Sequence, residues 1–167
     1  MKQTSHPWSI SFLRAWQQPV IVDNKPGWQN TIGAQAAARA AADGYTFYFA
    51  TLAALVTNQY LFKQLPYDPE RDFLPVGFVT LNLVSYASGS VAMQDAMVAP
   101  TGMPVPVIER FNATLNAVLR EPDVVAHIGS IGPVVTAGYT PAQTAAFIDE
   151  ENMRWKALTA EIGVLPE

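Results

Sequence analysis

The fold is decided by residues 18–51, which read QPVIVDNKPGWQNTIGAQAAARAAADGYTFYFAT. The β-branched run at residues 19–22 predicts a buried strand, and the Pro-Gly pair within residues 23–27 predicts a turn after it. An alanine-rich stretch over residues 31–42 predicts a helix, and the aromatic run at residues 46–50 predicts a second strand. A strand, a helix and a strand in this order predict a right-handed βαβ unit with parallel strands.

The predicted ends of this helix follow from its flanking residues. Asn30 or Thr31 is expected to cap its N-terminus, and Asp43-Gly44 is expected to end it, with the glycine in the left-handed conformation. Further along, helical periodicity and turn signals predict helices at 52–63, 106–120, 123–128 and 141–162 and a third strand at Val76–Val79. The expected fold class is therefore α/β, with a short parallel or mixed sheet flanked by helices.

The composition excludes several classes of protein. Half of the residues are hydrophobic (50%), which excludes global disorder, and there is no cysteine for a disulfide or a thiolate metal site. Ten basic against fourteen acidic residues give a net charge of −4, without a basic cluster, which argues against nucleic-acid binding. No apolar window is long enough for a signal peptide or a membrane helix, so the chain as written is expected to be cytoplasmic.

The chemistry-bearing residues do not form a catalytic set. Asp68, Glu70 and Asp72 have the spacing of the first ligands in an EF-hand loop, but Phe73 stands where that loop needs glycine, so a solvated turn is favoured over a metal site. His127 has no suitably spaced partner and is interpreted as a packed or surface histidine rather than a general base. We therefore expect no enzyme, no cofactor and no metal.

Two loops rich in small residues remain as candidate anion sites. Thr51-Leu52-Ala53 follows the second strand and leads into a helix, whose free amide groups attract anions. Residues 86–90, Tyr-Ala-Ser-Gly-Ser, place hydroxyl groups beside a glycine that permits close backbone approach. An ordinary structural turn is the alternative for each loop, because glycine and serine are common turn residues.

Several strings of the chain, taken in order, resemble the solute-binding receptors of tripartite tricarboxylate transporters, the Bug family. The resemblance covers nearly the whole chain from about Phe12 onward. The strings that carry it are Gln18–Gly27, Ile32–Ala34, Asp43–Thr46, Leu65–Pro69, Asp72-Phe73, Pro75-Val76, Tyr86–Ser90, Ala99–Pro104, Thr140-Pro141, Phe147-Ile148, Arg154-Trp155 and Ile162-Gly163.

The resemblance implies a periplasmic receptor with a two-lobed, type II periplasmic-binding-protein-like fold. Such a receptor captures small carboxylates through backbone amides, hydroxyls and ordered water, and hands them to membrane permease subunits. Carried onto this sequence, the resemblance implies ligand contacts from Thr51 and Ala53 in the first lobe. It implies further contacts from Ser88, Gly89 and Ser90 in the second.

The chain also departs from the family pattern. The family's signal peptide, first strand and Pro-Gly-Gly loop are not seen before Phe12, Trp28 replaces a small residue, and most of the second lobe is missing between Met97 and Val98. The expected parts are a first-lobe βαβ core at 1–80, a stub of the second lobe at 81–97, and a return segment with C-terminal helices packing on the first lobe at 98–167. The stretch Ser85–Met97 is expected to be the least ordered, because its home lobe is gone.

These departures leave two functions open. The first is a carboxylate receptor whose binding is weakened by truncation, since a two-lobed site gains affinity by enclosing its ligand. The second is a non-binding remnant or structural fragment of such a receptor. Charged residues make up only 14% of the chain, so surfaces that once faced missing parts are expected to be bare and to promote self-association.

Overall fold

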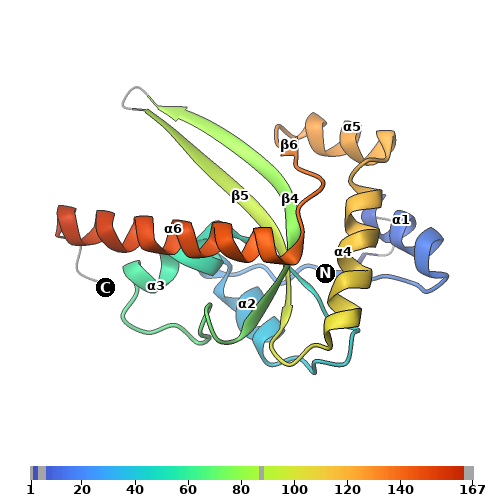
Figure 1. The fold of residues 1–167 in the computed structure, drawn as a ribbon, viewed down its shortest axis with the longest axis horizontal. Coiled ribbons are helices and arrows are strands. Elements are labelled where there is room, and N and C mark those ends of the chain that lie inside the picture. Colours follow the sequence, from blue (N-terminus) through green and yellow to red (C-terminus); the bar gives the residue numbers. More distant parts are fainter. Residues whose placement is uncertain (1, 4–6, 87–88, 164–167) are drawn as a thin grey trace.

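The computed structural model describes residues 2–3, 7–86 and 89–163 (Figure 1). Its helices are α1 (Pro7–Trp16), α2 (Thr31–Ala38), α3 (Asn58–Leu61), α4 (Val105–Val118), α5 (Pro122–Ser130) and α6 (Pro141–Ile162). A 3-10 turn, η1 (Trp28–Asn30), and a π-helical turn, η2 (Ala53–Thr57), precede α2 and α3. The strands are β1 (Lys2–Gln3), β2 (Val22–Asp23), β3 (Tyr48–Thr51), β4 (Phe73–Tyr86), β5 (Gly89–Pro100) and β6 (Val134–Val135).

The main sheet has the order β3-β5-β4-β6, and every pairing in it is antiparallel. The predicted parallel βαβ unit is therefore wrong. The predicted buried strand at 19–22 overlaps β2 only at Val22 and is not buried, and β2 pairs with β1 in a separate two-stranded sheet. The second predicted strand matches β3, which pairs with β5. β5 was not predicted, because the run that contains it shows no clear alternation of apolar and polar residues.

The main sheet lies between two groups of helices (Figure 1). Residues 96–99 of β5 are all apolar and buried, and they point alternately to the two faces of the sheet. Met97 and Ala99 join the core formed with α1, α4 and α5, whereas Ala96 and Val98 join the core formed with α2, η2 and α6. A strand buried on both faces explains why this α/β chain packs as three layers.

The helical predictions agree with the structure more closely than the strand predictions. α4 and α6 match the expected helices 106–120 and 141–162 within two residues at each end, and Thr140 forms the predicted N-cap of α6. α2 ends at Ala38, four residues before the predicted end. Asn30 is not a side-chain cap of α2, because its left-handed backbone (φ 62°) directs the side chain elsewhere.

The hairpin of β4 and β5 projects away from the helices (Figure 1). Its ladder runs from Phe73↔Pro100 to Tyr86↔Gly89, so both strands cross the boundaries expected at 80/81 and 97/98. Apart from residues 87–88, which lie outside the described residues, the backbone of Ser85–Met97 is paired strand. The expectation that Ser85–Met97 is the least ordered stretch stays a prediction, and it is tested by measuring the protection of its amides from hydrogen exchange.

Candidate functional site

Thr51, the first predicted ligand residue, ends β3, and one residue, Leu52, separates it from η2. Its hydroxyl oxygen accepts hydrogen bonds from Asn30 Nδ2 (3.1 Å) and from the amide of Ala54 (3.4 Å). In both bonds the hydroxyl is the acceptor, so its hydrogen stays available as a donor. Ala53 follows as the first residue of a π-helical turn, a geometry that is rare and often occurs at functional sites.

The loop at η1 accepts three further hydrogen bonds, from β3, from α3 and from the start of α2. Tyr48 Oη donates to the Asn30 carbonyl (3.3 Å), and Asn58 Nδ2 donates to the Gln29 carbonyl (3.0 Å). Thr31 Oγ1 donates to the Trp28 carbonyl (2.7 Å). Gln29 and Asn30 both have left-handed backbones (φ 49° and 62°), a strained conformation that these bonds hold in place. The two loops therefore form one connected polar rim.

The rim rests on a buried polar base. Asn58 is only 2% exposed and also donates to Tyr67 Oη (3.4 Å), which itself donates to the Ala54 carbonyl (2.8 Å). Burial raises the pKa of Tyr48 to about 12 and also raises the pKa of Tyr67. Both phenols therefore stay protonated near neutral pH and act as donors, Tyr48 to the Asn30 carbonyl of η1 and Tyr67 to the Ala54 carbonyl of η2.

Trp28 occupies the outer side of this rim. Its ring contacts that of Phe62, with centroids 4.3 Å apart, and its side chain is 60% exposed. The tryptophan thus packs over an apolar neighbour at the surface.

Two further polar residues lie beside Thr51 in the sheet. Asp95 of β5 pairs in register with Thr51 on one side and with Thr80 of β4 on the other. Thr80 Oγ1 donates to Asp95 Oδ2 at 2.5 Å. The sequence did not point to Asp95, Thr80, Asn30 or Asn58 as candidate site residues, because only strand register and long-range hydrogen bonds bring them together.

The predicted second-lobe residues are not brought to Thr51. Ser88 lies outside the described residues, and Gly89 and Ser90 begin β5 at the far end of the hairpin. Ser90 lies five residues from Asp95, about 17 Å along an extended strand. The structure therefore assembles the first predicted loop with η1 and leaves the second loop apart.

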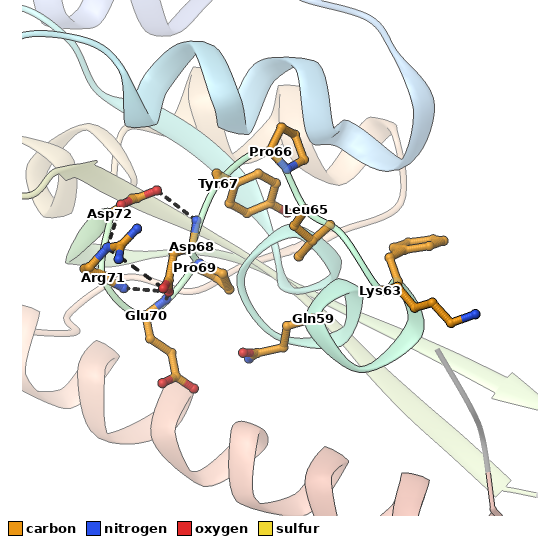
Figure 2. Close-up of a pocket in the computed structure, with 11 residues that line it drawn as sticks. Gln59, Lys63, Leu65, Pro66, Tyr67, Asp68, Pro69, Glu70, Arg71 and Asp72 are labelled. Atoms are coloured by element: carbon orange, nitrogen blue, oxygen red, sulfur yellow. Dashed lines mark hydrogen bonds and ion pairs between the residues drawn. The ribbon is translucent and has the colours of Figure 1, made fainter. Parts of the chain in front are cut away.

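The acidic segment Asp68–Asp72 forms a turn around an open hollow of about 560 Å3 (Figure 2). Asp68 Oδ1 accepts from the amides of Glu70 and Arg71, both at 3.1 Å, and Asp72 Oδ2 accepts from the Asp68 amide (2.8 Å). These carboxylates hold their own turn. Three carboxylates and two cations line the hollow, a balance that disfavours an anionic ligand.

Other candidate chemistry is not assembled in the described part of the chain. His127 lies on the exposed side of α5, and His6 lies outside the described residues. In residues 2–3, 7–86 and 89–163, no three His, Asp or Glu side chains gather as a metal site. None of the described helices combines the length and the apolar character needed to cross a membrane.

Residues 11–95 match the sequence model of the tripartite tricarboxylate transporter family receptor. This match spans half of the chain and includes Thr51, Ala53, η1 and Asp95. The chain belongs to this receptor family. The membership predicted from the sequence is thereby confirmed.

Relatives of this receptor chain are found among curated bacterial proteins. It is 46% identical to a UPF0065 protein of Bordetella bronchiseptica over 77 residues, which is 46% of this chain and 23% of the relative. It is 37% identical to protein BugT of Bordetella pertussis over 86 residues, which is 49% of this chain and 26% of BugT. The chain thus spans about a quarter of the length of the curated relatives that it matches.

Solved structures extend the comparison over nearly the whole chain. The Rhodopseudomonas palustris protein Rpa4515 with adipate gives a TM-score of 0.82 at 15% identity, over 95% of this chain and 91% of that chain. Periplasmic binding protein BugD gives a TM-score of 0.81 at 16% identity, over 96% of this chain and 92% of BugD. MatC from Rhodopseudomonas palustris with bound malate gives a TM-score of 0.78 at 17% identity, over 92% of each chain. The receptor chain therefore has the α/β fold of these periplasmic binding proteins, as expected from its sequence.

Proposed function

We propose that this chain is a periplasmic receptor of a tripartite tricarboxylate transport system that binds small carboxylates at Thr51 and Ala53. The observation that carries the proposal is the rim itself, in which η1 is hydrogen-bonded to the end of β3 within the segment that matches the receptor family. Hydroxyl and amide donors hold a carboxylate without a cationic side chain. Two structural neighbours, Rpa4515 with adipate and MatC with bound malate, supply the class of probe.

Binding is expected to be weak, because Gly89 and Ser90, two of the predicted second-lobe contacts, begin β5 at the far end of the hairpin from Thr51. We propose that the chain consists of a first-lobe core (1–80), a stub of the second lobe (81–97) and a return segment (98–167). A Kd of about 1 mM, or about −4 kcal/mol, is the scale expected for a few hydrogen bonds on an open surface. Membrane permease subunits are the partners that a functional receptor would engage.

Isothermal titration of the chain with adipate and malate tests this proposal. The Thr51→Val variant removes the rim hydroxyl while keeping the side-chain shape, and it is expected to abolish the measurable binding. Thr101→Val is the matched control, because Thr101 is exposed, lies just beyond Pro100 and bonds to the Arg71 carbonyl rather than to the rim. A submicromolar Kd for adipate or malate would contradict the expectation that the chain binds carboxylates only weakly. No binding by the parent chain would favour the alternative, a non-binding remnant of the receptor.

We also propose that the chain self-associates through exposed apolar side chains. Large apolar residues lie open on several elements, including Tyr45 (91% exposed), Met153 (67%) and Ile162 (61%). Sedimentation velocity over a concentration series tests the idea, and a strictly monomeric chain would contradict it.

A further inference from the structure

The polar row formed by Thr51, Asp95 and Thr80 crosses three adjacent strands of the sheet. Residues directly opposite one another on neighbouring strands point to the same face, with Cβ atoms about 4.5–5.5 Å apart. Asp95 lies between the two threonines in this register, so its carboxyl group is a direct neighbour of the Thr51 side chain. Asp95 and Thr51 are both partly exposed, which leaves them accessible to a ligand.

Thr80 fixes the carboxyl group from the other side. Thr80 is 4% exposed and donates its hydroxyl hydrogen to Asp95 Oδ2 at 2.5 Å. Partial burial raises the pKa of Asp95, and the hydrogen bond from Thr80 opposes this shift. Asp95 Oδ2 is thereby held by Thr80, while the partial burial of Asp95 disfavours its ionised form.

Met97 and Ala99 of β5 pack with α1, α4 and α5, and in the described part of the chain no charged side chain of these helices forms an ion pair with Asp95. β3, β4 and α2 make the main contacts with β5. Residues 31–38, 48–51 and 73–81 of these elements contain no acidic or basic side chain, and Tyr48 is their one titratable residue. Tyr48 points to the opposite face of β3 from Thr51, because the two are three residues apart on one strand. A carboxylate bound at Thr51 would therefore meet the uncompensated charge of Asp95.

We propose that Asp95 is a specificity-determining residue of the Thr51 site, and that a carboxylate ligand binds there with uptake of one proton from solvent by Asp95. This inference rests on the proposed function. The protonated carboxyl group donates an O–H···O⁻ hydrogen bond to the ligand, whereas the ionised group repels it. Affinity falls as the pH rises through the pKa of Asp95, because the binding-competent protonated form is then lost.

Titration calorimetry with adipate, from about pH 6 to about pH 8, tests the inference, since adipate carboxyls are ionised throughout that range. The parent chain is expected to bind more weakly as the pH rises and to show proton uptake in buffers of different ionisation enthalpy. Asp95→Asn removes the charge but keeps a hydrogen-bond donor. This variant is expected to bind about tenfold more tightly than the parent at the upper pH, with little pH dependence.

Two further variants separate a ligand role from a structural one. Thr80→Val removes the bond that favours the ionised carboxyl, so the pH midpoint of binding is expected to move upward. Asp149→Asn, at an exposed position on α6, is the matched control and is expected to leave binding and its pH dependence unchanged. If Asp95→Asn does not fold, the pH midpoint of Thr80→Val decides the matter, and an unchanged midpoint overturns the inference.

The outcomes distinguish this inference from the proposed function. Binding of adipate by the parent chain with the same affinity and pH dependence in Asp95→Asn overturns the role of Asp95 and leaves the receptor function standing. Absence of binding by both proteins at every pH overturns the receptor function and this inference with it.

Discussion

Replacement of Asn58 by alanine is expected to destabilise the chain by about 2 kcal/mol. The side chain is 2% exposed, and its bond to the Gln29 carbonyl (3.0 Å) contributes about 1 kcal/mol. The contact with Tyr67 Oη is long at 3.4 Å and adds only a few tenths. Loss of the carboxamide leaves a cavity of about 40 Å3, which costs about 1 kcal/mol at roughly 24 cal/mol per Å3. The Gln29 residue is exposed, so water satisfies its freed carbonyl.

Urea unfolding followed by tryptophan fluorescence measures this change. The thermal midpoint is expected to fall by about 4–8 °C, since 1 kcal/mol corresponds to about 2–4 °C in a chain of this size. Gln64→Ala, at an exposed loop position, is the control and is expected to stay within about 0.5 kcal/mol. A double-mutant cycle with Tyr67→Phe is expected to give a coupling below about 0.5 kcal/mol. A loss below about 0.5 kcal/mol for Asn58→Ala would refute the reasoning that this residue anchors η1.

Three other perturbations follow from individual contacts. Gly77→Ala is expected to lower the free energy of unfolding by about 1–3 kcal/mol, because the new Cβ would lie 2.9 Å from Asn112 Nδ2 and 3.1 Å from Leu115 Cδ2. Gly129→Ala is the control, because a Cβ there meets no atom within 4 Å, and it is expected to be neutral or slightly stabilising in the same assay. Thr140→Ala removes the hydroxyl that accepts from the Gln143 amide (3.2 Å), and a loss of about 1 kcal/mol in thermal unfolding is expected. Asp95 has a pKa raised above its ordinary value of 3.8, so its contribution to stability is full below that value and declines as the pH rises through the folded-state pKa. Asp95→Asn is accordingly expected to gain stability relative to the parent as the pH rises, and a stability difference that does not vary with pH would contradict the burial of this carboxyl.

Local sequence signals predicted the long helices α4 and α6 of this protein. The spacing of Ile108, Phe111 and Leu115 predicted α4, because helical periodicity is a short-range property that survives in the tertiary structure. Thr140-Pro141 predicted the start of α6 for the same reason, since a cap needs only residues within one turn. α1 was missed, although Phe12 and Trp16 are spaced four residues apart and pack together on Phe111.

The sequence by itself determined the family and suggested Thr51 as a ligand residue, whereas the tertiary structure decided strand direction and which polar side chains lie beside Thr51. β3 was predicted, but its antiparallel partner β5 lies some 45 residues away in the sequence, and pairing at that distance has no local signal. The same register sets Asp95 between Thr51 and Thr80, and long-range bonds from Asn30 and Asn58 complete the rim. Periodicity and capping arise from neighbouring residues, while register is fixed by the burial of both sheet faces, so only the folded chain shows which polar side chains meet.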